Sequence, residues 1–290
     1  MNIYLKVFLL IPFLTACSSM TDMRIPLSEA FESDSTLFVI ESPTWRVPDS
    51  VYNKKIAGYS VVNAKTSFRK SKKELINNKT IDNSINFLLF NDKDYSIEVN
   101  EYEVESNISF SFDLQADGLK LSSAYCKINS LNTDEREVSE EEKKWPYSTS
   151  DRSENNREHR LKTYLSCSIE LGRSSWDLQF SSNKNRMLKL KLDSDIESFK
   201  VLNVSDFIFL HEDEKGDITH VAKEGSYYPR KYLLNTGLEF FNEFEQVSAL
   251  SFVGKPRVWI NNNSPEEKKQ LFLTVNYSLL MFNWLDSAWR

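Results

Sequence analysis

Strict alternation of apolar and polar residues is the feature that most constrains the fold of this chain. In the segment 107–115, NISFSFDLQ, the residues Ile108, Phe110, Phe112 and Leu114 alternate with polar neighbours. Successive side chains of a β-strand point to opposite faces, so this pattern predicts one buried face and one wetted face. Such an arrangement is typical of antiparallel sheets.

The same period of two recurs in many segments between residues 35 and 222. The predicted strands are 35–42, 56–63, 84–90, 94–104, 107–115, 119–129, 163–171, 175–180 and 187–193. Turns are predicted between them at 91–94, 115–118 and 181–185. Many short strands with frequent turns favour an antiparallel β-sandwich or an open barrel. The predicted fold class is therefore mainly β, or α+β when a C-terminal hairpin and a buried helix are included.

The pattern changes beyond residue 225. The segment 238–247, LEFFNEFEQV, is predicted to be a helix, and 249–261 is predicted to be a hairpin that turns at Gly254-Lys255-Pro256. We expect residues 226–290 to form an α/β element that packs on a β-rich domain of residues 35–225.

A second helix is predicted at the C-terminus, from Pro265 to about Ala288. Ser264 as N-cap, Pro265 at the first helical position and Glu267 form a capping box. Apolar side chains cover most of the circumference of this helix, which favours burial inside the protein over contact with a membrane or a partner.

The N-terminus has the segment order of an export signal. One lysine lies among the first six residues, and the run from Val7 to Ala16 carries no charge. A helical run of this length reaches about 15 Å, half of a hydrocarbon core of ~30 Å, so it is too short to span a membrane. A charged start, a short apolar run and small residues predict a secretory signal peptide over residues 1–16.

The sequence Leu14-Thr15-Ala16-Cys17 resembles the lipobox of bacterial lipoproteins, which ends in an invariant cysteine. The resemblance implies cleavage before Cys17, attachment of diacylglycerol to its sulfur and acylation, for example with palmitate, of its new amino group. Several acyl chains would hold the protein to a membrane stably. Ser18, where aspartate would favour the inner membrane, implies the outer membrane if the host is Gram-negative. Residues 17–34 are expected to be the lipidated cysteine and a polar tether.

Two further cysteines, Cys126 and Cys167, each lie in a predicted strand. An exported protein folds in an oxidising compartment, so a disulfide between them is expected, with two reduced buried thiols as the alternative. A metal or nucleophilic role has little support, because neither cysteine has CxxC spacing or a histidine close by. The residues between the two strands, 132–160, are almost wholly polar and are predicted to be a charged, mobile loop.

Two further candidate sites involve histidines and aromatic residues. His211 and His220 flank the acidic stretch EDEKGDIT and would approach each other in a hairpin, where a His/carboxylate metal site could form. A solvated acidic hairpin tip is the simpler interpretation, and a solvated side chain is also expected for His159. Trp145 and Tyr147 form an apolar island in the charged loop and could bind a partner, since such residues are frequent in interfaces. A tryptophan that folds back onto the domain is the simpler interpretation there.

Composition argues against several classes of function. The chain has only seven glycines and no GxGxxG, GxxxxGK[ST] or GxSxG motif, which disfavours dinucleotide folds, phosphate-binding loops and nucleophile elbows. The net charge of −6 gives no reason to expect nucleic acid as a partner. The basic stretch at 69–73 is expected to be a solvated loop.

The sequence therefore predicts a lipid-anchored protein of the cell envelope, in the periplasm or at the outer membrane. We expect it to serve as a non-catalytic binding or assembly module without a cofactor, held to the membrane by its lipid and able to contact an envelope protein. An envelope hydrolase acting on cell-wall or surface polymers is one alternative, and a metal-binding lipoprotein is another. No catalytic residue can be selected from the sequence.

Overall fold

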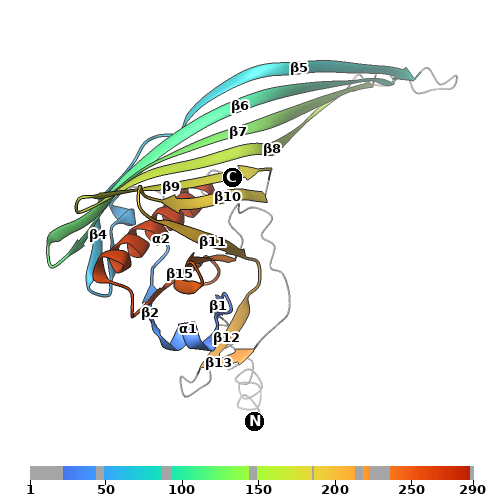
Figure 1. Ribbon diagram of the computed structural model, residues 1–290. Helices are drawn as coiled ribbons and strands as arrows, with labels where there is room; N and C mark the ends of the chain where they lie inside the picture. Colours follow the sequence, from blue (N-terminus) through green and yellow to red (C-terminus); the bar gives the residue numbers. More distant parts are fainter. Residues whose placement is uncertain are drawn as a thin grey trace, which may run out of the picture. The chain divides into compact units, whose positions relative to one another are not determined.

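The computed structural model describes residues 22–43, 49–85, 93–143, 149–184, 186–212, 218–221 and 236–287 (Figure 1). The chain divides into two compact units. Unit 1 combines Met1–Ser42, Leu202–Pro229 and Leu234–Ser264, and unit 2 combines Pro43–Val201, Arg230–Leu233 and Pro265–Arg290. Antiparallel strands dominate the described residues, which confirms the predicted mainly β fold class.

Unit 2 is built around a long antiparallel meander. Its strands are β3 (Lys54–Ile56), β4 (Tyr59–Thr66), β5 (Lys70–Ile85), β6 (Lys93–Ala116), β7 (Leu119–Lys143), β8 (Thr149–Leu171), β9 (Ser174–Asn183), β10 (Arg186–Asp193) and β11 (Ser198–Val204), which continues into unit 1. From β6 to β11 each strand pairs with the next along the chain. Strands β4 and β5 both pair with β6, one after the other along its length, and a short 3₁₀ helix precedes β3 at Asp49–Tyr52.

The β6–β7 hairpin shows how the meander obtains its register. Its two-residue turn is Asp117-Gly118, and both residues have positive φ, +49° and +77°. This is the backbone of the turn that matches the right-handed twist of paired strands, and glycine adopts it without steric cost. The ladder then runs from Ala116 opposite Leu119 to Lys93 opposite Lys143 with a single register shift.

Helix α2 (Glu266–Ser287) packs on one face of this meander (Figure 1). We call this face the inner face and the opposite one the outer face. Phe112 contacts Tyr277 edge to face with ring centres 4.9 Å apart, and Ser122 forms a hydrogen bond of 2.6 Å with Thr274. Every residue of α2 from 271 to 282 is buried, which confirms the predicted buried C-terminal helix and its bounds to within two residues.

Unit 1 is smaller and contains two groups of strands. Its elements are β1 (Asp22–Arg24), α1 (Glu29–Ser33), β2 (Ser35–Val39), β12 (Ile208–Glu212), β13 (Ile218–Val221), β14 (Gly237–Asn242), β15 (Glu245–Ser251) and β16 (Arg257–Asn261). One group has the order β2-β16-β15-β14 and the other the order β1-β12-β13. Ile25, Phe31, Ala249 and Trp259 form a core cluster of this unit.

Five expectations about segments need correction. Residues 238–247 form a β-hairpin, β14 and β15, and not a helix, because each strand is paired along its length. Residues 17–34 are not an irregular tether throughout, since β1 and α1 lie within them. Residues 70–73 are exposed, as expected, but they belong to β5 and not to a loop. The division into units also differs from the boundary expected at 225/226, because α2 belongs with the meander and the 249–261 hairpin belongs with the N-terminal residues.

The expected mobile loop at 132–160 is the largest correction. Residues 132–143 are the second half of β7, and 149–160 are the first half of β8. They pair in register from Asn132 opposite Arg160 to Lys143 opposite Thr149. The predicted strand 84–90 begins within β5, and its remaining residues lie outside the described part of the chain.

Candidate functional site

The most distinctive surface of unit 2 is a four-stranded extension that we call the wing. It consists of β5, residues 93–107 of β6, 129–143 of β7 and 149–161 of β8. Strand β9 begins to pair with β8 only at Lys162, so the wing continues beyond the sheet that α2 covers (Figure 1). Fifteen residues of strand span about 50 Å at ~3.4 Å each, and the 25 residues of β7 span about 80 Å.

Both long edges of the wing are open among the described residues. In the wing, β5 pairs only with β6, and residues 149–160 of β8 pair only with β7. The side chains of residues 71–80 and 151–159 are exposed without exception. An unpaired edge presents backbone N–H and C=O groups that can pair with another chain, and charged residues such as lysine usually discourage this.

Cross-strand polar pairs hold the inner face of the wing together. Lys73 lies over the ring of Tyr102 at 4.2 Å and also pairs with Asp134 at 3.1 Å. Arg136 pairs with Glu154 at 2.8 Å, and their hydrogen bond lowers the pKa of the Glu154 carboxyl. Each exposed pair stabilises the sheet only slightly, so the ladder depends on many of them together.

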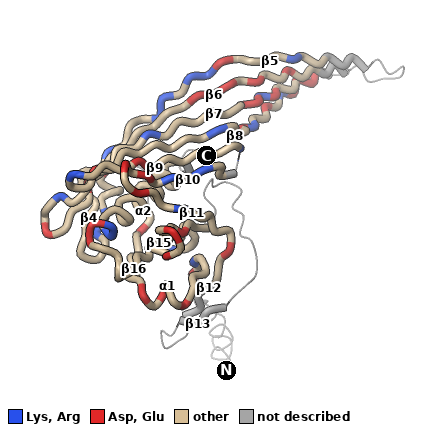
Figure 2. The backbone as a smooth tube through the Cα atoms, in the orientation of Figure 1, with Lys and Arg blue, Asp and Glu red and all other residues tan. Residues whose placement is uncertain are grey.

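Acidic residues give the wing a negative net charge (Figure 2). The wing contains sixteen Asp and Glu and ten Lys and Arg, a net charge of −6 that equals the charge of the whole chain. By register and alternation, a run of glutamates lies on the outer face of the two central strands: Glu101, Glu103, Glu105, Glu135, Glu137 and Glu141. Arg157 is near two of them, 3.6 Å from Glu135 and 4.0 Å from Glu137.

A hollow of about 420 Å³ lies on the sheet where the wing begins. We call it the basal hollow. It is lined by Glu105, Ser106, Asn107, Asn129, Ser130, Leu131, Lys162 and Tyr164. Two rows of outer-face residues form most of its floor: Asn107, Asn129 and Tyr164 stand opposite one another on three adjacent strands, and Glu105, Leu131 and Lys162 form the next row. The register shift of the β7–β8 ladder directly follows Leu131.

A second cavity, of about 340 Å³, lies at the opposite end of the meander. The β8–β9 turn, the β10–β11 turn and the first turn of α2 surround it. Two of its charged groups pair with each other, since Lys268 binds Glu197 at 2.5 Å, and Ser174 donates to Glu267 at 3.4 Å. Trp176 lines it as a mostly buried side chain.

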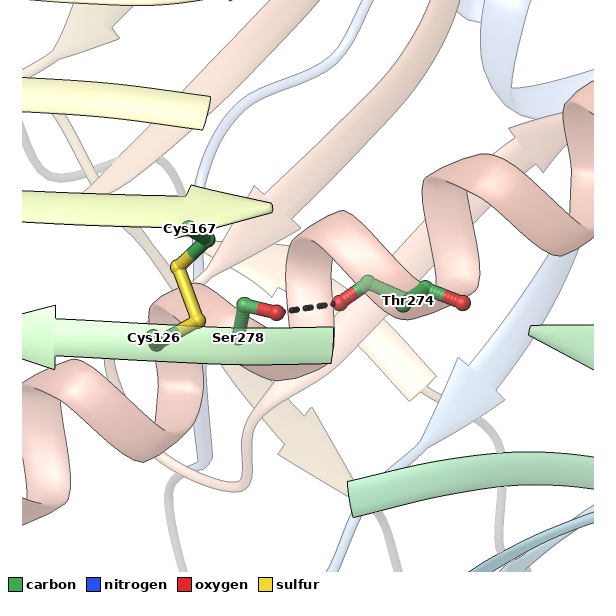
Figure 3. Close-up of a disulfide and its surroundings, with 4 residues drawn as sticks. All are labelled: Cys126, Cys167, Thr274 and Ser278. Carbon is green, nitrogen blue, oxygen red and sulfur yellow. Dashed lines mark hydrogen bonds between the residues drawn. A yellow bond between two sulfur atoms is a disulfide. The ribbon is translucent and has the colours of Figure 1, made fainter. Parts of the chain in front are cut away.

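The predicted disulfide between Cys126 and Cys167 is confirmed (Figure 3). The two residues stand directly opposite each other on β7 and β8, with Cα atoms 4.0 Å apart. Both side chains are buried on the inner face next to α2, whose Ser278 hydroxyl donates to the Thr274 carbonyl at 2.8 Å.

The other predicted site residues are placed only in part. The expected hairpin of β12 and β13 is present, with His211 opposite Thr219 and His220 opposite Leu210, so the two histidines are close in register but not direct partners. The acidic turn between them lies outside the described residues, and the metal site stays a prediction. Among the side chains that the structure describes, no three His, Cys, Asp or Glu residues gather as a metal site. Cys17, Trp145 and Tyr147 also lie outside the described residues.

Sequence reasoning predicted the strand 94–104 of the wing but missed the rest of the wing and the basal hollow. A signal for the wing exists in the strand-like pattern of 94–115, which is about twice as long as the upper end of the usual range for a strand. No local signal marks the hollow, because its residues come from three strands.

No family model, curated protein or solved structure matches the chain. Within the part of the chain that the structure describes, no helix combines the length and the apolar character that crossing a bilayer requires.

Proposed function

We propose that this chain is a lipid-anchored protein of the bacterial cell envelope that binds or assembles with another envelope component through the wing. The observation that carries the proposal is the form of the wing: among the described residues of unit 2, nothing pairs with its two edges and no other element covers its two faces (Figure 1). Ordering about sixty residues costs conformational entropy that little burial compensates here. Such a sheet offers a large contact area that the core of unit 2 does not use.

The composition of the wing supports a binding role over a purely structural one. A surface with a net charge of −6 and few exposed apolar side chains stays soluble and attracts partners of opposite charge. The anchor rests on the lipobox resemblance at Leu14-Thr15-Ala16-Cys17, and Ser18 supports the outer membrane as its location. The hydrolase and metal-binding alternatives stay predictions.

Membrane fractionation tests the anchor. The native protein is expected in the membrane fraction and to resist a high-salt wash, because acyl chains and not charges would hold it. Cys17→Ser is expected in the soluble fraction, and Ser18→Ala is the matched control that keeps the cysteine and stays with the membrane. If Cys17→Ser remains in the washed membranes, the lipid anchor is refuted.

A trimmed wing tests the binding role. Asn77, Glu101, Glu135 and Arg157 form one row across the four strands, so the wing can be cut at this row without changing the register. Residues 78–100 and 136–156 would each be replaced by Asn-Gly, which forms a two-residue hairpin turn.

The trimmed and intact proteins would be crosslinked in their own envelope and purified in detergent. An envelope component bound to the intact protein and lost from the trimmed protein, with the disulfide still formed and the melting temperature kept, is the expected result. Recovery of the same components by both proteins, or of none by the intact protein, would contradict a binding role for the wing.

A further inference from the structure

We propose that the basal hollow binds a neutral sugar unit of an oligosaccharide or polysaccharide chain. This goes beyond the function proposed for the wing, because it assigns a ligand class to the base of the wing, which the trimmed variant retains, and not to its extended part. The carrying observation is a two-by-three grid of side chains on the outer face of β6, β7 and β8.

The dimensions of the grid suit a small cyclic ligand. Neighbouring strands lie about 4.8 Å apart and residues of one face repeat every ~6.8 Å along a strand, so three strands and two rows give a floor of roughly 10 by 7 Å. The volume of about 420 Å³ lies in the range of small-molecule sites.

The row of Asn107, Asn129 and Tyr164 provides the groups that a sugar ring requires. Tyr164 is 47% exposed, and its ring offers a flat apolar surface to the C–H face of a pyranose. The two asparagines are exposed, and each amide presents both a donor and an acceptor to neighbouring hydroxyls. Neither amide forms a hydrogen bond with another described residue, so both are available to a ligand.

The second row favours a ligand without net charge. Glu105 and Lys162 lie on either side of Leu131, and together they contribute one negative and one positive charge. Within the floor an anionic ligand would meet Glu105 and a cationic ligand would meet Lys162, while Lys70 and Lys72 of β5 flank the two rows beside Asn107 and Glu105. Leu131 between them adds an apolar contact at the centre of the floor.

A second exposed tyrosine extends the surface toward the covered part of the sheet. Tyr125 is 54% exposed on the outer face of β7, four residues from Asn129 and therefore about 13 Å from it along the strand. The residues beside Tyr125 on the neighbouring strands are Ser111 and Ser168, which are small and polar. A chain of several sugar units can thus lie along β7, from the basal hollow past the exposed Lys127 to Tyr125.

Binding of defined sugars to the full-length protein in detergent micelles tests this assignment. The probes are cellobiose, maltose and N,N′-diacetylchitobiose, their hexasaccharides, and digalacturonic acid as an anionic counterpart, measured by ligand-observed NMR. We expect at least one neutral disaccharide to bind and Tyr164→Ala to weaken it tenfold or more, while digalacturonic acid binds more weakly than that disaccharide.

Tyr125→Ala is the matched control, because it removes an equally exposed tyrosine from the same face. A disaccharide in the hollow is too short to contact Tyr125, so this variant should change disaccharide affinity less than twofold and weaken only the hexasaccharide. The assignment is overturned if no neutral disaccharide binds, if both tyrosine variants weaken the disaccharide equally, or if digalacturonic acid binds most tightly. The trimmed wing retains all six grid residues, so it should still bind sugar even if the wing proves to have no partner.

Discussion

Cys126 and Cys167 occupy directly opposite positions of the β7–β8 ladder and are joined by a disulfide on the face that α2 covers. The bridge therefore joins β7 to β8 near the base of the wing. It lies on the side of the basal hollow that is nearer to the core of unit 2. All residues of the β7–β8 half of the wing lie inside the closed loop, which has a sequence separation of 41 residues.

Removing this bridge should destabilise unit 2. The double variant Cys126→Ala/Cys167→Ala is expected to lose about 2–4 kcal/mol of unfolding free energy, because a closed loop of this length restricts the unfolded chain. Urea denaturation with and without dithiothreitol measures the loss. The native protein with reductant should match the variant, and a native midpoint that does not respond to reductant would show that the bridge does not stabilise the fold.

The buried hydroxyl of Tyr277 should also stabilise the folded state. It lies on α2, is fully buried and donates a hydrogen bond to the backbone carbonyl of Tyr52. Tyr277→Phe removes this donor in the core and is expected to cost about 1–3 kcal/mol in thermal or urea unfolding. Tyr59→Phe, which removes a hydroxyl bonded to Glu266 near the surface, is the control and should cost less than about 1 kcal/mol. Equal losses in both variants would contradict the prediction.

Alkaline pH should weaken the fold through the same residue. Burial raises the pKa of Tyr277 well above its usual value of 10, so the folded state keeps the proton after the unfolded chain has lost it. The stability is therefore fully present below pH ~10 and falls as the pH rises above it, by about 1.4 kcal/mol per pH unit. Burial and the neighbouring Glu266 also raise the pKa of Tyr59, to about 12, with the same sign.

The comparison of native protein and Tyr277→Phe between pH 9 and 12 isolates this effect. The native protein should lose stability more steeply, and the curves should converge as the pH rises. Parallel curves would show that Tyr277 ionises equally in both states.

Asp22 should make unit 1 sensitive to acid. Burial alone would raise the pKa of its carboxyl, but the side chain of Arg257 and the backbone N–H groups of Met23 and Lys255 outweigh burial and lower it. A lowered folded pKa stabilises the protein above the unfolded value near 3.8, and this stabilisation is lost as the pH falls through the folded value.

Asp22→Asn should therefore destabilise unit 1 at pH 7 by about 1–3 kcal/mol, since Arg257 loses a charged hydrogen-bond partner. Hydrogen exchange of β16 reports on this unit directly. The difference between native protein and variant should shrink below pH ~3.8, and a difference that persists at pH 2 would argue against an ionised Asp22 as its source.

The sequence predicts best where a strand has one buried face. Phe110, Phe112 and Leu114 alternate because α2 covers them, and the same holds for Cys126 and Cys167, so the core of unit 2 and its disulfide can be anticipated. The capping residues before Glu266 mark the start of α2 for a different reason, because they act within one helical turn.

Most of the wing, apart from the strand 94–104, could not be predicted because it has no core to impose alternation. The residues of β7 from Asp134 to Glu137 are all charged, yet they continue the ladder that the apolar half of the hairpin begins. Only Val138 is a buried apolar residue in this part of β7. Alternation of apolar and polar residues depends on burial of one face. It therefore cannot predict a strand that is paired on both sides but exposed to solvent on both faces.

The hairpin of β14 and β15 is mispredicted for the opposite reason, because its sequence has an excess of apolar residues. In 238–247, Phe240 is buried, Phe241 is half-buried and Phe244 is 96% exposed in the turn. Apolar residues at 238, 241 and 244 also match a helical spacing, so the sequence fits both periods. Pairing of β15 with β16 selects the strand.

The early start of β1 has a consequence for the reach of the protein. If Cys17 carries the lipid, only four residues separate it from Asp22, whose carboxylate binds Arg257 within unit 1. Five residue-to-residue steps of at most ~3.6 Å limit the distance between Cys17 and Asp22 to about 18 Å. Unit 1 would then be confined to the immediate vicinity of the bilayer, and a flexible linker could not carry the protein to a distant target. Any contact far from the membrane would have to be made by rigid strands such as those of the wing.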